Sequence, residues 1–222
     1  MTPSENAAVE PRGSVALALS ARCVALFLER GTTKGTSAGE LARNAGVSIR
    51  TFHRYLGTKE SSVRPVLFAA IDAMAAALDA RPEAEHLDIA LAESFATAAS
   101  GVWLERTLRL IPLLTETRKM RAVWAQSLSD GEVALTDPIA RRMELPAGSP
   151  RAAVLATVIM ALIRRALTDA VAENADPAPI FADYLTTLSA GPLARPAHQE
   201  PRSVPNPHKK QGVSHGSGGF TA

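Results

Sequence analysis

Residues 37–60, SAGELARNAGVSIRTFHRYLGTKE, carry the clearest structural signal in this chain of 222 residues. Ser37 and Glu40 form an S-x-x-E capping box, in which the hydroxyl and the carboxylate each bond a backbone amide at the start of a helix. That helix is expected to end at Gly46, because glycine adopts the left-handed conformation of a helix end without steric cost. Ser48 is the expected N-cap of a second helix. The segment therefore predicts two short helices joined by a tight turn.

The second helix of this pair has two chemically different sides. A period of 3.6 residues turns Phe52 and Leu56 inward and places Ile49, Arg50 and His53 together on the outer face. A polar, basic second helix after a tight turn is typical of a helix-turn-helix, which places that helix in the DNA major groove. The alternative is a helical hairpin whose basic face is only solvated, since capping boxes and glycine turns occur in many helical proteins.

The segment resembles the helix-turn-helix of the TetR family of bacterial transcription regulators. That family shows a glycine, a short Thr-rich loop, a helix ending in A-x-x-A-G-V-S, and then x-x-T-F-Y-x-Y-F-x-x-K-E. The matching residues are Gly31, Thr36, Ser37, Leu41, Ala42, Ala45, Gly46, Val47, Ser48, Thr51, Phe52, Arg54, Tyr55, Lys59 and Glu60. The chain departs from the pattern with His53 for an aromatic residue, Leu56 for Phe, and a loop one residue longer before Ser37. The resemblance is strong over residues 31–60 and weak over 14–190.

The resemblance implies that this segment contacts both the phosphates and the base edges of DNA. Arg50 is expected to bond a guanine with two N–H groups, and Ile49 to touch a thymine methyl. Phosphates are expected at helix N-termini, where Thr36, Ser37 and Lys59 lie. The full predicted DNA-contacting set is Thr36, Ser37, Ser48, Ile49, Arg50, Thr51, His53, Arg54, Tyr55 and Lys59.

Composition and charge agree with an all-helical protein that has a basic end. Apolar residues make up 46% of the chain and aromatic residues only 5%, with alanine and leucine dominant, which favours helices. Residues 14–64 hold eight Lys/Arg against three acids, a net of +5, whereas residues 65–192 hold eleven against sixteen, a net of −5. A basic head on an acidic body fits a DNA footprint at one end of the molecule.

We expect an all-α protein with an N-terminal three-helix helix-turn-helix DNA-binding domain and a C-terminal helical ligand-binding and dimerisation domain. The predicted segments are a disordered N-terminus (1–13), the DNA-binding domain (14–60), the second domain (61–190) and a disordered tail (191–222). The helices expected in the second domain span about 59–80, 83–99, 103–114, 117–143, 151–173 and 178–190. Prolines interrupt the hydrogen-bond ladder of a helix, so Pro65 is expected either to kink the first of these or to mark a later start, and Pro112 and Pro138 are further candidate breaks, as is Gly131.

In the TetR family the body holds a small-molecule pocket under the fourth helix, and ligand binding there changes the separation of the two DNA-reading heads. The candidate lining residues in this chain are Phe68, Met74, Phe95, Trp103, Met120, Trp124 and Gln126. The alternative for each is ordinary core packing, which is the common fate of apolar residues at helical spacing. Arg109-Leu110-Ile111 together with Trp124 resembles a subgroup that senses fatty-acyl thioesters, so the expected inducer is an apolar or acyl molecule of unknown identity.

The family also dimerises through its last two helices, which form a four-helix bundle across a twofold axis. The resemblance therefore implies a homodimer on a palindromic DNA operator. The predicted interface consists of Leu155, Ile159, Leu162, Ile163, Phe181, Tyr184, Leu185 and Leu188. Part of this surface must also be core within the chain.

Other classes of protein find little support in the sequence. Cys23 is the single cysteine, so no intrachain disulfide forms, and Cys23 with His53 is the one conceivable pair of nucleophile and base. No hydrolase, zinc-protease, phosphate-loop or dinucleotide motif is present, so we expect neither an enzyme nor a cofactor. The spacing of His198, His208 and His215 matches no compact metal site. No signal sequence is evident and no apolar run approaches the roughly 20 residues of a membrane span, which predicts a cytoplasmic protein.

The sequence thus predicts a DNA-binding transcriptional regulator, a homodimeric repressor released from its operator by a small molecule. The alternative is an all-helical small-molecule-binding or adaptor protein that does not bind DNA.

Overall fold

The computed structural model describes the backbone of residues 3–191 and the side-chain surroundings of residues 13–101 and 104–191. Within this range the regular structure is entirely helical, which confirms the all-α class. Residues up to Ala190 form one compact unit. The predicted disordered tail, apart from Gly191, lies outside the described residues, as do His198, His208 and His215.

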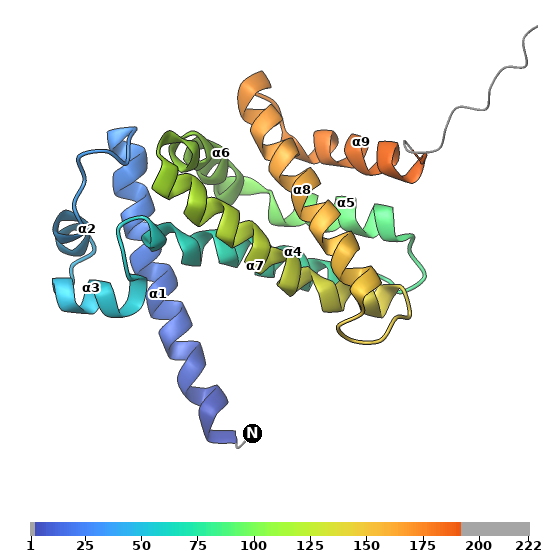
Figure 1. The fold of residues 1–222 in the computed structure, drawn as a ribbon, viewed down its shortest axis with the longest axis horizontal. Helices are drawn as coiled ribbons and strands as arrows, with labels where there is room; N and C mark the ends of the chain where they lie inside the picture. Colours follow the sequence, from blue (N-terminus) through green and yellow to red (C-terminus); the bar gives the residue numbers. More distant parts are fainter. Residues whose placement is uncertain (1–2, 192–222) are drawn as a thin grey trace, which may run out of the picture. The chain divides into compact units, whose positions relative to one another are not determined.

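The N-terminal helices include the predicted pair that a tight turn joins (Figure 1). Helix α1 spans Pro3–Arg30, α2 spans Ala38–Asn44 and α3 spans Ile49–Leu56. The sequence predicted disorder up to residue 13 and a helix start at Ser14, whereas the helix begins at Pro3. Pro3 lies at the first position of this helix, where a proline removes no hydrogen bond.

The connection to the body shows how Pro65 is accommodated. A short 3₁₀ turn, η1 (Ser61–Val63), precedes α4 (Arg64–Ala80), and Pro65 lies in the first turn of α4. Amides of a first turn have no partner within the helix, so a proline there removes no bond. The helix therefore starts at Arg64, later than the predicted residue 59.

The middle helices continue through the residues that were candidate breaks. Helix α5 spans Leu87–Ala98, α6 spans Gly101–Glu116 and contains Pro112, and α7 spans Arg118–Arg142 and contains Gly131 and Pro138. A proline inside a helix costs about 3 kcal/mol, and burial of neighbouring side chains, such as Leu135 and Ile139 around Pro138, offsets that cost here.

The last two helices complete the body. Helix α8 spans Pro150–Glu173 and α9 spans Pro177–Ser189, with a left-handed Asn174 and an Asp176 N-cap between them. In Figure 1, α8 crosses α7 and α9 lies beside α5, in agreement with the contacts between these helices.

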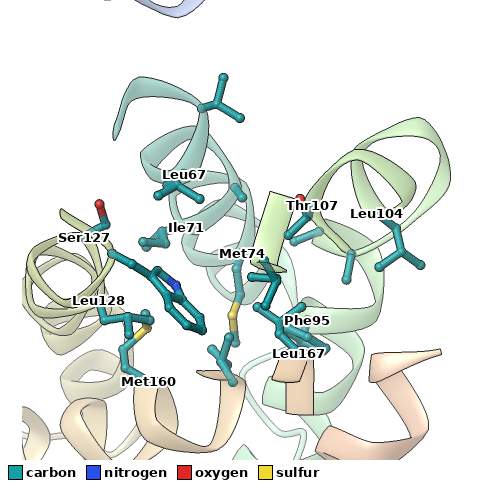
Figure 2. A pocket seen from close by; sticks show the side chains of 17 residues that line it. Leu67, Ile71, Met74, Phe95, Leu104, Thr107, Ser127, Leu128, Met160 and Leu167 are labelled. Carbon is teal, nitrogen blue, oxygen red and sulfur yellow. The ribbon is translucent and has the colours of Figure 1, made fainter. Parts of the chain in front are cut away.

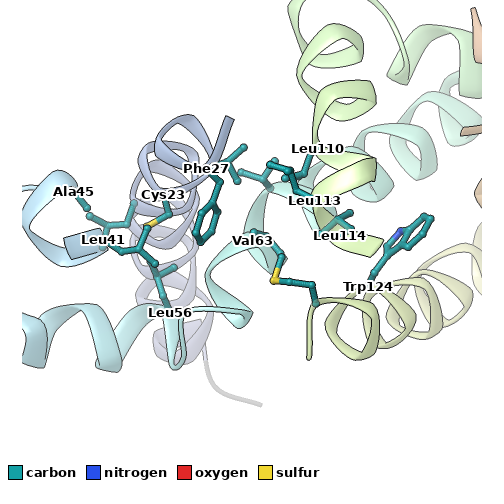
Figure 3. Packing of buried hydrophobic residues seen from close by; sticks show 14 of the residues in the cluster. Cys23, Phe27, Leu41, Ala45, Leu56, Val63, Leu110, Leu113, Leu114 and Trp124 are labelled. Atoms are coloured by element: carbon teal, nitrogen blue, oxygen red, sulfur yellow. The ribbon is translucent and has the colours of Figure 1, made fainter. Parts of the chain in front are cut away.

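Two clusters of buried hydrophobic residues hold the fold together. The first packs α1–α3 around Phe27 and Phe52 and continues through Val63 to Leu114 and Met120 (Figure 3). The second lies in the body and includes Leu78, Phe95, Leu135, Ile159 and Phe181. The first cluster runs across residue 60, and α1 contacts η1, α4 and α6. The domain boundary at residue 60 stays a prediction.

One helical stretch is long and apolar enough to cross a membrane by length and composition, contrary to the sequence expectation. It spans Ser61–Ala80, which includes α4. Core helices of soluble proteins pass the same test, and α4 contributes Val66, Met74 and Leu78 to the buried interior, so this is weak evidence for a span.

Candidate nucleic-acid interface and ligand cavity

The caps that define the helix-turn-helix are confirmed. The Ser37 hydroxyl accepts from the Glu40 amide at 3.2 Å, and the Glu40 carboxylate accepts from the Ser37 amide at 2.8 Å. Ser48 caps α3 by accepting from the Thr51 amide at 3.1 Å, and Gly46 has a φ of +71° in the turn. Hydrogen bonds from Ser37, with a further one from Arg30, lower the pKa of Glu40 to about 2, so the capping carboxylate is ionised at neutral pH.

Helix α3 exposes the face that the sequence predicted. Phe52 and Leu56 are buried, whereas Ile49 is 45% exposed and Arg50, His53 and Arg54 are also at the surface. Arg50 forms no ion pair within the described part of the chain. The outer face of α3 therefore offers a cation that is free to bind an external acceptor.

The neighbours of Arg50 on this face are held in place by local contacts. The Arg54 guanidinium lies 4.7 Å from the centroid of the Tyr55 ring, a cation–π distance. His53 Nδ1 lies 2.6 Å from the Gly57 carbonyl oxygen, which fixes the ring orientation. Ser48 and Thr51 share a hydrogen bond between their hydroxyls at 2.9 Å. These contacts restrict the side chains on both sides of the predicted groove contact.

Two predicted phosphate contacts are engaged within the protein instead. Thr36 is buried and its hydroxyl accepts from Arg30 at 2.9 Å, so its side chain does not face a ligand. The Lys59 ammonium donates to the Thr33 carbonyl oxygen at 3.1 Å and lies 3.8 Å from the Glu60 carboxylate. The sequence pattern places both residues near DNA, but long-range packing of the loop before α2 turns them toward the protein.

A carboxylate that the sequence analysis missed holds this loop. Glu116, in the last turn of α6, accepts hydrogen bonds from the Thr33 amide at 2.8 Å, from the Thr33 hydroxyl at 2.7 Å and from the Thr32 hydroxyl. Lys34 lies 3.7 Å away. These hydrogen bonds, with the Thr32 hydroxyl foremost and the charge of Lys34 last, lower the pKa of Glu116 to about 2. We call this group of Thr32, Thr33 and Glu116 the α6 latch.

A signal for the α6 latch is present in the sequence but is weak. An acid in the last turn of a helix opposes the helix dipole, so its presence there suggests a compensating partner. Identifying that partner requires contacts more than 80 residues apart in the chain. A further contact between the N-terminal helices and the body is the hydrogen bond that the Ser20 hydroxyl donates to the Ser62 carbonyl oxygen at 2.6 Å. Within the body, Arg64 of α4 pairs with Asp130 of α7 at 2.5 Å.

An apolar cavity lies in the body between α4, α5, α6, α7 and α8 (Figure 2). It contains about 790 Å³ of space free of protein atoms, a figure that includes its open mouth. Three predicted lining residues, Met74, Phe95 and Trp124, do line it. Helices α4 and α6, which both border the cavity, also contact α1.

The other predicted pocket residues are placed elsewhere. Met120 is buried in the cluster beneath the helix-turn-helix, and Phe68 is 39% exposed on another side of α4. Gln126 faces out of α7 and donates to Asp130 at 3.0 Å. These predictions were wrong because residue type alone did not reveal which side of each helix faces the cavity. The side chain of Trp103 lies outside the described residues.

The predicted dimer surface is partly used within the chain. Ile159, Ile163, Phe181 and Leu185 are buried in the core of the body and cannot meet a partner. Only the partly exposed members of the predicted set remain available, namely Leu155, Leu162, Tyr184 and Leu188.

The conceivable pair of nucleophile and base is not assembled. Cys23 is fully buried in the first cluster, and burial raises the pKa of its thiol to about 11. The thiol is therefore protonated at neutral pH and is a poor nucleophile. His53 lies on the exposed face of α3.

Comparison with known proteins gives one distant likeness to report. No family model and no curated protein matches the chain. Among solved structures, the chain is similar to a crystal structure described as a candidate TetR-family transcriptional regulator from Mesorhizobium loti MAFF303099. The sequence identity is 15%, the match covers 81% of this chain and 95% of that one, and the TM-score is 0.48. A likeness this distant carries no functional argument. The function proposed below rests on the geometry of the chain itself.

Proposed function

We propose that this protein is a DNA-binding transcriptional regulator that reads the major groove with α3. The observation that carries the proposal is the surface of α3, where Ile49, Arg50 and His53 are exposed beside a capped turn while Phe52 and Leu56 anchor the helix in the core. An exposed basic helix held rigidly by its own buried side supplies both the charge and the fixed orientation that base-edge contacts need.

The proposal extends to a cytoplasmic homodimer that acts as a repressor and releases its operator when a small molecule occupies the cavity. Two heads bind successive major grooves only if they are separated by about one helical turn, roughly 34 Å. Helices α4 and α6 border the cavity and contact α1. A ligand with different affinity for two arrangements of these helices would change that separation.

A gel shift of the purified full chain on the intergenic DNA upstream of its own gene tests the proposal. We expect a discrete complex that survives an excess of unrelated competitor DNA and weakens as salt is raised. The alternative, a helical small-molecule-binding or adaptor protein, predicts either no complex or one that unrelated DNA competes away equally well.

A further inference from the structure

The cavity in the body is lined in a way that restricts the chemistry of its ligand. We propose that it takes a neutral, hydrogen-bond-poor hydrophobe, not an acyl molecule with an anionic headgroup, and that Gly131 sets the size of molecule it accepts. The regulatory meaning of this ligand rests on the proposed function, whereas its chemical class does not.

The charge of the lining restricts the charge of the ligand. None of the described lining side chains is charged, and the hydrogen-bonding groups among them are the hydroxyls of Thr107 and Ser127 and the indole N–H of Trp124. The Ser127 hydroxyl is buried and donates to the Val123 carbonyl oxygen at 3.0 Å within its own helix. A carboxylate or phosphate placed here would lose its water without gaining a cation or a set of donors, which is strongly unfavourable. An uncharged molecule avoids that penalty.

The walls of the cavity are aromatic and aliphatic side chains, some of them flexible. Figure 2 shows Phe95 and Leu104 on one side of the cavity and Leu128 and Met160 on the other. Aromatic walls favour ring-containing molecules by stacking and edge contacts, and methionine side chains adapt to irregular shapes.

Gly131 is buried on α7 behind two of the lining side chains. A Cβ at this position would lie 2.6 Å from Met160 Cε, closer than real Cβ atoms approach, and 3.0 Å from Ile71 Cδ1, which is tighter than most real Cβ contacts. The absent side chain is what lets Met160 and Ile71 withdraw from the cavity. Because both are flexible ends of side chains, an added methyl group would push them into the free space without requiring the backbone to move.

A matched pair of fluorescent probes tests the charge requirement. N-phenyl-1-naphthylamine and 1-anilinonaphthalene-8-sulfonate share one ring skeleton and differ by a sulfonate. Titrated into the full chain at neutral pH, the neutral probe is expected to bind at least tenfold more tightly than the anionic one. Equal or tighter binding of the sulfonate would overturn the proposal.

Two variants test the role of Gly131. Gly131→Ala is expected to weaken binding of the neutral probe at least fivefold. Gly39→Ala adds the same methyl group on α2, where the new Cβ would lie 3.9 Å from the Ser37 hydroxyl oxygen, and is expected to leave binding unchanged. Should Gly131→Ala lose its helical circular dichroism, Ala70→Leu, which fills the cavity from α4, is expected to weaken binding in its place. Unchanged binding in the folded variant would overturn the proposal.

These readouts separate this inference from the proposed function. Probe binding is measured without DNA, so a chain that prefers the neutral probe but fails the gel shift retains the ligand class and loses the regulator assignment. A chain that shifts DNA specifically and shows no preference between the probes does the reverse.

Discussion

Arg50 and Lys59 are both cations that the family resemblance places against DNA, but their surroundings differ. Lys59 is tied to the Thr33 carbonyl oxygen, whereas Arg50 is exposed on α3 without an ion pair in the described part of the chain. Local sequence predicted both the position and the exposure of Arg50, because they follow from helical phase and two caps. The engagement of Lys59 depends on a loop fold that no local pattern encodes.

The role of Arg50 in reading a base can be tested by substitution. Arg50→Ala is expected to lower the preference for the specific site over single-base variants of it by about 1–3 kcal/mol at one base pair, because it removes a bidentate contact to one base. Fluorescence anisotropy with the upstream DNA and its single-base variants measures this. Arg118→Ala, which removes an exposed cation from the start of α7 in the body, is the control. Equal loss of preference in both variants would contradict a base contact by Arg50.

At the scale of elements, the α6 latch joins the end of a cavity-lining helix to the loop before α2. The pKa of Glu116 is lowered to about 2 in the folded protein by the donors of Thr32 and Thr33. A carboxyl whose pKa is lowered on folding contributes stability above its unfolded pKa, about 4.3 for glutamate, and loses that contribution as pH falls toward 2. The α6 latch therefore stabilises the fold at neutral pH and fails in acid.

Glu116→Gln tests the α6 latch. The substitution keeps an acceptor but removes the charge, so we expect the free energy of unfolding at pH 7 to fall by about 1 kcal/mol, which corresponds to a melting temperature about 2–4 °C lower. We also expect less stability to be lost between pH 5 and pH 2 than in the unmodified chain. Glu173→Gln, at an exposed glutamate in the last turn of α8, is the matched control. Parallel pH profiles for both variants and the unmodified chain would contradict this role.

The same scale shows why some elements were predictable and others were not. The α2 and α3 caps, the loop before α8 and the inward side of α3 were predicted correctly, because each depends on residues within one or two turns of chain. The predicted break at Pro112 was wrong because packing overrides the local cost of a proline inside a helix. The cavity was predicted only in part, since its lining depends on how five helices are rotated against one another.

At the scale of the molecule, the proposed dimer has less apolar surface available than the sequence suggests. The core of the body buries four of the predicted interface residues, namely Ile159, Ile163, Phe181 and Leu185. Leu188, near the end of α9, is partly exposed and belongs to neither buried cluster. It is therefore the member of the predicted set at which a charge does least damage to the fold.

Leu188→Arg is expected to convert the dimer to a monomer, because it buries a charge at the proposed interface. Light scattering coupled to size exclusion would then give one chain mass, 23.4 kDa, in place of two. Val133→Arg is the control, since Val133 is 77% exposed on α7 and lies outside the last two helices. A monomeric Val133→Arg beside a dimeric Leu188→Arg would move the interface to α7.

The uneven charge of the molecule leads to a prediction about salt dependence. The slope of DNA affinity against salt concentration is expected to report how many DNA-reading heads touch the duplex. Several basic residues of the head are engaged within the chain, such as Arg30 with Glu40 and Arg64 with Asp130, which leaves Arg43, Arg50 and Arg54 exposed without ion pairs in the described residues. Each neutralised phosphate contributes about −0.9 to the slope of log K against log salt concentration. Two heads with three such cations each predict a slope of about −5, and one head predicts about −3.

Titration between 50 and 200 mM salt is expected to give a slope of about −5 for the unmodified chain and about −3 for Leu188→Arg. A slope that is the same for both proteins would show that the second head does not touch the duplex, and the proposed reading of two successive grooves would then fail.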